Sequence, residues 1–131
     1  MNEKSYKELS RQIIGACITV HRELGPGLLE SVYEECLSFQ LINLGLHVER
    51  QVKFPVLYKG HALTKTFIMD IVVDKKIVLE LKAVQELSAI SHVQLMTYLK
   101  MTRMKLGLLI NFNVELLRDG IVRKINGDLD N

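Results

Sequence analysis

The hydrophobic period of the chain changes near His47 and changes back near Ser88, and this switch constrains the fold more than any other feature. Two N-terminal segments, 4–24 and 28–44, carry apolar side chains at helical spacing. Three segments then alternate or run apolar, as strands do. The expected strands are 47–60, 62–74, 76–84 and 106–112, the expected third helix starts at Leu87 or Ser88 and ends at Arg103, and a further short strand fits before residue 124.

Turn residues separate these segments. The sequence Gly25-Pro26-Gly27 divides the first two helices, and Gly45 suits the end of the second. The resulting order, α-α-β-β-β-α-β, predicts an α/β domain with a mixed sheet flanked by helices. No repeat or linker interrupts the order, so we expect one domain over 1–131, with a core from about residue 5 to 125 and a frayed tail over 126–131.

Composition narrows the class of protein. The 131 residues are 48% hydrophobic and 24% charged, which is ordinary for a globular domain. No apolar run approaches the ~20 residues that span a bilayer, and the polar N-terminus does not resemble a signal peptide. Cys17 and Cys36 form no metal-binding pair, and the histidines are scattered singly, so we expect free thiols in a reducing cytoplasm and no zinc site.

Three charged residues interrupt apolar strands. Asp70 lies within FIMDIVV, and Glu80 and Lys82 lie within IVLELKAV. Burying a charge is costly unless it is paired or used. Side chains two residues apart share a face of a strand, so Glu80 and Lys82 point the same way. If the two strands pair through the turn at 74–76, Asp70 meets them.

These three residues suit metal-assisted hydrolysis of a phosphodiester. Mg²⁺ binds one or two carboxylates together with water and phosphate oxygens, and it lowers the pKa of bound water. Lys82 would orient or deprotonate the water, or stabilise the developing charge. The structural alternative is a buried salt bridge between Lys82 and Asp70 or Glu80 with no chemistry.

The same residues resemble the signature of the PD-(D/E)XK nuclease superfamily, an acid followed by acid-x-Lys on the next strand. Here these are Asp70 and Glu80-Leu81-Lys82, with Met69 where one variant of the motif has proline. The closer resemblance is to the GxxExxY family of that superfamily, whose motif stands at 27–33 as GLLESVY. Further matching segments are 58–60, 80–83, Gln94 with Tyr98-Leu99, and 107–112, so the resemblance covers about residues 5–125.

The resemblance implies a restriction-endonuclease-like αβββαβ core with an extra N-terminal helix. It also implies roles for individual residues. Asp70 and Glu80 are implied metal ligands together with the carbonyl of Leu81, and Lys82 is the implied catalytic lysine. Glu30 is implied to bind metal directly or through water, and Gln94 and Tyr98 are implied to flank the site.

Ordinary explanations exist for several of these residues. Glu30 lies in the first turn of a helix, where the dipole favours a carboxylate anyway, and Tyr33 suits packing with a tethered hydroxyl. Gln94 and Tyr98 share one helical face. Ile90 and Met101 extend that face, so we expect this stripe to pack on the sheet, with Gln94 buried and bonded either to the acid-lysine cluster or to the backbone.

Basic residues provide candidate contacts to nucleic acid. The net charge is only +2, so a polyanion must be bound through a local patch. Lys59 lies in a turn and could reach a phosphate. Lys100, Arg103 and Lys105 form a patch at a helix end, where cations are common for other reasons, and Arg118, Arg123 and Lys124 could extend it.

The sequence therefore predicts a Mg²⁺- or Mn²⁺-dependent nuclease acting on nucleic acid, most simply DNA. A chain of this size offers little surface to grip a duplex, so a homodimer or a partner protein is expected to help. Two alternatives stay open. The fold could serve as a non-catalytic module that binds nucleic acid or protein, or the site could act on a small nucleotide as a phosphoesterase.

Overall fold

The computed structural model describes residues 4–129, and its elements follow the order expected from the sequence. Helices α1 (Tyr6–Leu24) and α2 (Glu30–Asn43) come first, and helix α3 (Ala89–Thr102) follows three strands. The strands are β1 (Val48–Tyr58), β2 (His61–Val73), β3 (Ile77–Lys82), β4 (Leu106–Asn111) and β5 (Ile121–Ile125), with a short 3-10 helix, η1 (Leu117–Gly120), before β5. The further short strand expected near the C-terminus is therefore β5.

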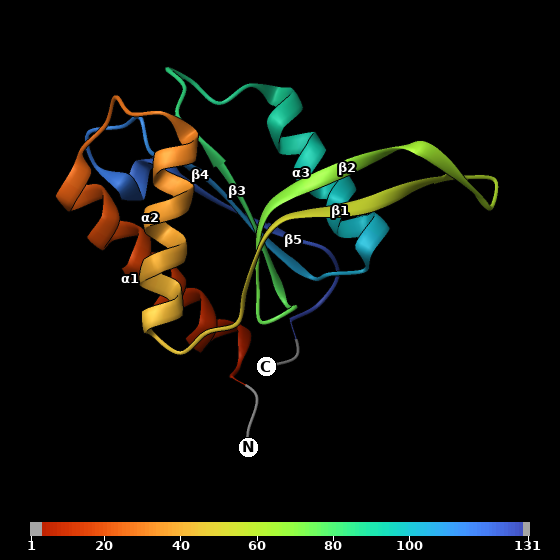
Figure 1. Ribbon diagram of the computed structural model, residues 1–131, viewed down its shortest axis with the longest axis horizontal. Helices are drawn as coiled ribbons and strands as arrows, with labels where there is room; N and C mark the ends of the chain where they lie inside the picture. Colours follow the sequence, from red (N-terminus) through yellow and green to blue (C-terminus); the bar gives the residue numbers. More distant parts are fainter. Residues whose placement is uncertain (1–3, 130–131) are drawn as a thin grey trace.

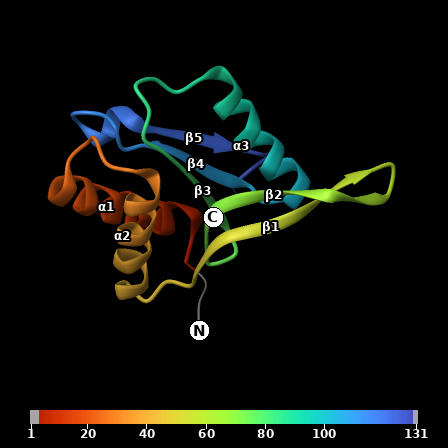
Figure 2. The ribbon, with the colours of Figure 1, turned by 45° about the horizontal axis from the view of Figure 1, so that its top comes forward.

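The sheet is mixed and separates two layers of helix. Its strand order is β1-β2-β3-β4-β5, with β3 parallel to β4 and the other neighbours antiparallel. Helices α1 and α2 cover one face and α3 covers the other (Figures 1 and 2). Helix α3 supplies the crossover that a parallel pair requires. The expected α/β class, with an αβββαβ core and an extra N-terminal helix, is confirmed.

Local sequence explains where these elements begin and end. The Ser5 side chain caps α1 by accepting a hydrogen bond from the backbone N–H of Glu8 at 3.1 Å. Lys59 and Gly60 link β1 to β2 with φ angles of 50° and 81°. Two successive positive φ angles are typical of the tight turn that matches the twist of a hairpin, and glycine adopts one of them without strain.

Each face of the sheet has its own apolar core. On the first face, buried residues of α1 and α2 pack against strand residues such as Ile71, Leu79 and Leu108. On the second face, α3 packs on Met69, Val72, Val78 and Leu109 through three buried residues, Leu95, Tyr98 and Leu99. In β3, Leu79 and Leu81 therefore point to the α1–α2 side, and the even-numbered residues point to the α3 side.

A buried tyrosine ties the turn between the first two helices to the core. Tyr33 is fully buried, and its ring stacks on Phe112 with centroids 4.4 Å apart. Its hydroxyl donates to the carbonyl of Gly25 at 2.6 Å and accepts from the N–H of Leu28 at 3.2 Å. The prediction of a packed tyrosine with a tethered hydroxyl is confirmed, and the contact fixes the approach to α2.

The C-terminal segment is anchored at its start. The sequence predicts that residues 126–131 are frayed, but the backbone N–H of Asn126 donates to the carbonyl of Lys105 at 2.8 Å, and its side chain donates to the carbonyls of Leu99 and Met104. Residues 130 and 131 of this segment lie outside the described part of the chain. Between residues 4 and 129, no helix is long and apolar enough to cross a membrane.

Candidate active site

Strands β2 and β3 separate at the two acidic residues. They pair over Ile71–Leu79, Val72–Val78 and Val73–Ile77, and the next positions in register are Asp70 and Glu80. Beyond this point β2 leaves the sheet with β1 as a projecting hairpin (Figure 1). We call this point of separation the fork. It lies between α2 on one side and α3 on the other (Figures 1 and 2).

Carboxylates replace backbone pairing at the fork. The N–H of Asp70 donates to Glu80 Oε1 at 3.2 Å, and the N–H of Leu81 donates to Asp70 Oδ2 at 2.8 Å. Each acid thus satisfies a backbone donor that the separated strands leave unpaired. This arrangement holds both carboxyl groups at one point, as expected for two strands that pair through the turn at 74–76.

The side-chain alternation of both hairpin strands shifts at the fork. In β2, Phe67 and Met69 pack on the α3 side, whereas Ile71 and Val73 pack on the α1–α2 side. The shift falls at Asp70, across from Gln51, whose φ of 51° is rare for a residue other than glycine. An irregularity of this kind redirects side chains, and here it turns the Asp70 carboxylate toward Glu80.

Burial and mutual repulsion perturb both carboxyl groups. Burial raises the pKa of Asp70, and the N–H of Leu81 lowers it in part. Burial and the neighbouring Asp70 raise the pKa of Glu80 to about 8. The two groups also lie within hydrogen-bond reach of each other. Without a cation, the pair therefore holds a proton near neutral pH, because two adjacent carboxylates resist ionising together.

Lys82 lies on the same side of β3 as Glu80 but does not close a salt bridge. Its positive charge lowers the pKa of Asp70 and of Glu80. Within the described residues, the ion pairs within 4.0 Å are His47–Glu49 and Arg50–Glu34, and neither involves Lys82. The alternative of a closed Lys82–carboxylate salt bridge is therefore not what the structure contains.

The donor set at the fork fits a hard divalent cation. Two carboxyl groups that repel each other provide oxygen ligands and a local negative charge. In residues 4–129, no group of three or more His, Cys, Asp or Glu side chains gathers closely enough to hold an ion. The protein would therefore provide two carboxylates, and water and phosphate oxygens would complete the coordination, which is the usual pattern for Mg²⁺.

Two acids of α2 face the fork, and one of them was missed in the sequence. Both Glu34 and Glu30 raise the pKa of Asp70 through their charge. Glu34 is buried, and it accepts hydrogen bonds from Arg50 Nε at 3.0 Å and from Gln51 Nε2 at 2.6 Å. Glu30 is exposed and does not join the two carboxylates in one cluster. The available signal was the spacing, because Glu34 lies one helical turn after Glu30.

On α3, Tyr98 faces the fork. Burial and the charges of Glu80 and Asp70 raise the pKa of Tyr98, whereas a hydrogen bond from Gln94 lowers it. The hydroxyl group therefore stays protonated and can act as a donor. The Tyr98 ring stacks on Phe67, with centroids 4.3 Å apart, which fixes its orientation.

The expected apolar stripe on α3 was assigned to the wrong face. Gln94 is exposed, Ile90 is 70% exposed and Met101 is 38% exposed, so of the four only Tyr98 packs on the sheet. Helix α3 carries apolar side chains of its own on every side, and their spacing alone therefore could not identify the face that is buried. Gln94 bonds to Tyr98 instead of lying buried among apolar residues.

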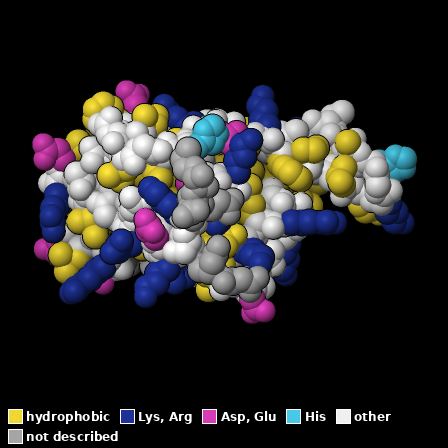
Figure 3. All heavy atoms as spheres, turned by 90° about the horizontal axis from the view of Figure 1, so that it is seen from below, with side chains coloured by type: hydrophobic (Ala, Val, Ile, Leu, Met, Phe, Trp, Pro, Cys, Tyr) yellow, Lys and Arg dark blue, Asp and Glu magenta, His cyan; other side chains and the backbone are white. Residues whose placement is uncertain are grey.

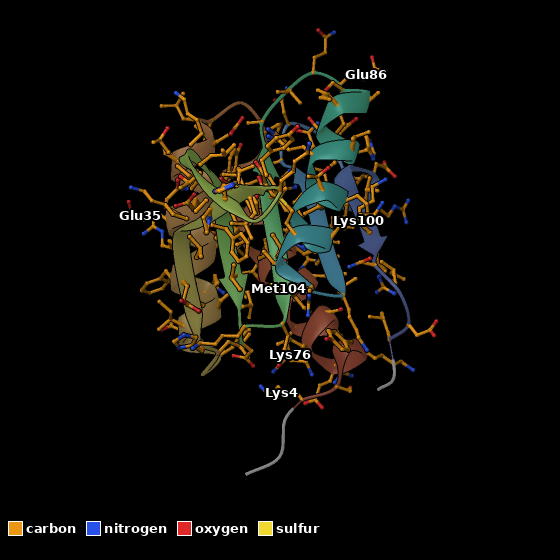
Figure 4. The ribbon with its side chains drawn as sticks, turned by 90° about the vertical axis from the view of Figure 1, so that its right-hand side faces the viewer. Lys4, Glu35, Lys76, Glu86, Lys100 and Met104 are labelled. Atoms are coloured by element: carbon orange, nitrogen blue, oxygen red, sulfur yellow. The ribbon has the colours of Figure 1, made fainter. Side chains whose placement is uncertain are left out.

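The other candidate residues lie away from the fork. Lys59 is in the turn at the far end of the hairpin, and Lys100 lies on the outer side of α3 (Figure 4). Arg103 ends α3 with a left-handed φ of 62°, and Lys105 precedes β4.

Burial raises the pKa of Cys17 to about 12, so this thiol stays protonated and is no nucleophile.

Comparison with known proteins agrees with this geometry. A family model described as the PD-(D/E)XK nuclease superfamily matches residues 7–124. No curated protein and no solved structure gives a match. Nucleases of this superfamily generally use divalent metal ions, which suits the two carboxylates at the fork. The chain belongs to the PD-(D/E)XK nuclease superfamily.

Proposed function

We propose that the protein is a Mg²⁺- or Mn²⁺-dependent nuclease of the GxxExxY family, formed by one domain over residues 1–131. The observation that carries this proposal is the meeting of Asp70, Glu80 and the unpaired Lys82 where β2 and β3 separate. Two carboxylates that repel each other form a dianionic ligand set for a divalent metal ion, and a nearby ammonium group suits an anionic substrate.

Each residue has a role in this proposal. Asp70 and Glu80, with the carbonyl of Leu81, would hold the ion, and Glu30 would contribute through water. When bound, the divalent ion would polarise the phosphate and activate a water molecule. Lys82 would orient that water or stabilise the developing negative charge, and the protonated hydroxyl of Tyr98, bonded to Gln94, would donate to a phosphate oxygen.

We propose nucleic acid, and DNA first, as the substrate. The fork lies at the base of a projecting hairpin whose outer residues, 57 to 66, are all exposed (Figure 1). An exposed, elongated element beside the site suits a long polymer, whereas a small nucleotide would be better held in an enclosed pocket. Lys59, Lys100, Arg103 and Lys105 are candidate contacts to the phosphate backbone, and a second copy or a partner protein would extend the binding surface.

We also propose a cytoplasmic location. Cys17 and Cys36 are both free in the structure. Unpaired cysteines are usual in reducing compartments and uncommon in oxidising ones.

A cleavage assay with Lys82→Met tests the proposal. We expect the purified protein to cut DNA in Mn²⁺ and the variant to lose at least about 100-fold in rate, because removing a group that stabilises transition-state charge costs this much in other enzymes. Lys7→Met is the matched control, since Lys7 is exposed on α1 in the other helix layer.

The control should cut DNA at the wild-type rate. Equal cleavage by Lys82→Met would contradict the proposed catalytic centre. No cleavage of DNA or RNA by the wild-type protein in Mn²⁺ or Mg²⁺ would favour the alternative of a non-catalytic binding module.

A further inference from the structure

The β1–β2 hairpin extends well past the rest of the sheet. We call residues 52–69 the hairpin arm. It projects from the body of the molecule on the α3 side of the fork (Figures 1 and 2), and every residue from 57 to 66 is exposed. The outer part of the arm covers no apolar core of the described chain. Packing within the fold therefore does not explain why the arm projects, and binding of another molecule would explain it.

The arm is basic and contains no acid. All 15 acidic residues lie outside the stretch between Glu49 and Asp70, which holds Arg50 and three lysines, Lys53, Lys59 and Lys65. Without these four residues, the chain has 13 basic residues against 15 acidic ones, so the stretch changes the net charge from −2 to +2. The face in Figure 3 shows basic and apolar side chains on the projecting arm and no acidic one.

The lysines are exposed and distributed along the arm. Lys53 neighbours Phe54 and so points to the opposite face, Lys65 lies in the irregular stretch of β2 where the register with β1 shifts, and Lys59 lies in the turn. No ion pair within residues 4–129 involves any of the three. The arm thus presents exposed positive charge along its length and at its tip, which suits a polyanion.

The root of the arm is fixed next to the carboxylates. Phe54 stacks on Phe67 at 5.4 Å between centroids, and Phe67 stacks on Tyr98 at 4.3 Å. Residue 70, directly after the arm, is the acid at the fork. A ligand that lies along the arm would therefore reach Asp70 without any rearrangement of the fold.

The dimensions favour a duplex over a single strand. A strand rises about 3.3 Å per residue, so the arm extends roughly 20 Å, and a two-stranded ribbon fits a major groove about 12 Å wide. Single strands are held by free aromatic rings. Phe54 and Phe67 are already stacked on protein rings, and of the Phe and Tyr rings on the arm only Tyr58, near the tip, is largely exposed.

We propose that the hairpin arm binds duplex nucleic acid along its phosphate backbone and aligns it with the carboxylates at the fork. The inference rests on the proposed function and deepens it by naming the element that grips the substrate. Leu57, Tyr58 and Leu63 are exposed on the arm and could also contact a lipid surface. The absence of acids favours the polyanion, and the test includes the lipid as an outcome.

Fluorescence anisotropy with a labelled 20-base-pair DNA duplex in EDTA tests the inference without cleavage. The arm variant is Lys53→Gln/Lys59→Gln/Lys65→Gln. Its matched control, Lys7→Gln/Arg11→Gln/Arg22→Gln, removes the same charge from the exposed surface of α1. We expect the arm variant to bind at least about tenfold more weakly near 0.1 M salt, with a slope of log affinity against log salt reduced by about 3, as for three lost phosphate contacts.

The control variant should keep the wild-type slope. Equal affinity and slope for the arm variant and the wild type would overturn the inference, as would tighter binding to a single strand, or binding to anionic lipid vesicles but not to the duplex. The two proposals fail separately. Arm-dependent binding without cleavage in Mn²⁺ would contradict only the proposed function, and cleavage with full affinity in the arm variant would contradict only the role of the arm.

Discussion

The proposed metal site needs Glu80 in its charged form, whereas burial in the fold favours the neutral form. Burial and Asp70 raise its pKa from 4.5 to about 8. The folded protein therefore holds a proton on Glu80 that the unfolded chain has released. The stability linked to this proton is fully present below pH ~4.5 and is lost as the pH rises through about 8.

Replacing Glu80 with Gln should stabilise the metal-free protein at alkaline pH. The amide oxygen still accepts the N–H of Asp70, and the buried charge is gone. We expect the free energy of unfolding at pH 8 to rise by on the order of 2 kcal/mol over the wild type, with little difference near pH 4.5. Urea unfolding in EDTA at several pH values measures this.

An exposed residue provides the control for this prediction. Glu86→Gln makes the same chemical change in the exposed loop before α3 (Figure 4), and it should change stability by less than about 0.5 kcal/mol at every pH. A Glu80→Gln variant less stable than the wild type at pH 8 would show that the carboxylate at the fork supports the fold more than it strains it.

At the scale of elements, the contact between α3 and β4 holds one wall of the site. Gly107 of β4 lies under Leu95, and an added Cβ would sit 2.9 Å from Leu95 Cδ1 and 3.1 Å from Cγ. Leu95 is fully buried and has little room to move. Gly107→Ala should therefore push α3 from the sheet and lower the free energy of unfolding by about 1–3 kcal/mol.

A second glycine distinguishes this steric effect from a general effect of alanine. Gly15 lies within α1, and a Cβ there would meet nothing within 4 Å. Gly15→Ala should raise stability by about 0.5–1 kcal/mol, since glycine is unfavourable in a helix. Chemical unfolding of both variants decides. A neutral Gly107→Ala would mean that α3 does not pack on β4 as closely as the structure has it.

Sequence reasoning succeeded for elements whose signal is local. The change of period located the helices and strands to within a few residues. The turn expected at 74–76 brought the strand that carries Asp70 against the strand that carries Glu80. It failed where the signal depends on the partner. Spacing did not identify the buried face of α3. The one-turn spacing from Glu30 points to Glu34, but only the contacts of Glu34 with Arg50 and Gln51 distinguish it from a surface acid.

At the scale of the whole molecule, the fork and the arm arise from one feature. Strands β1 and β2 are longer than β3, so they outrun the sheet, and their alternation shifts where they leave it. The alternating pattern of 47–74 predicted two strands but not that their outer halves stay exposed. Alternation indicates that one face of a strand is apolar, but it does not show whether another part of the same chain covers that face. The fold class was therefore predictable, and the projection was not.

Mn²⁺ binding followed by calorimetry tests most directly whether the fork is a metal site. We compare the wild type with Asp70→Asn, which keeps the shape of the side chain, and with Asp128→Asn, which alters an exposed carboxylate near the C-terminus. The account predicts that the wild type and Asp128→Asn bind Mn²⁺ alike and that Asp70→Asn binds at least about tenfold more weakly, since it loses a charged ligand. Equal Mn²⁺ binding by wild type and Asp70→Asn, or none by the wild type, would contradict it.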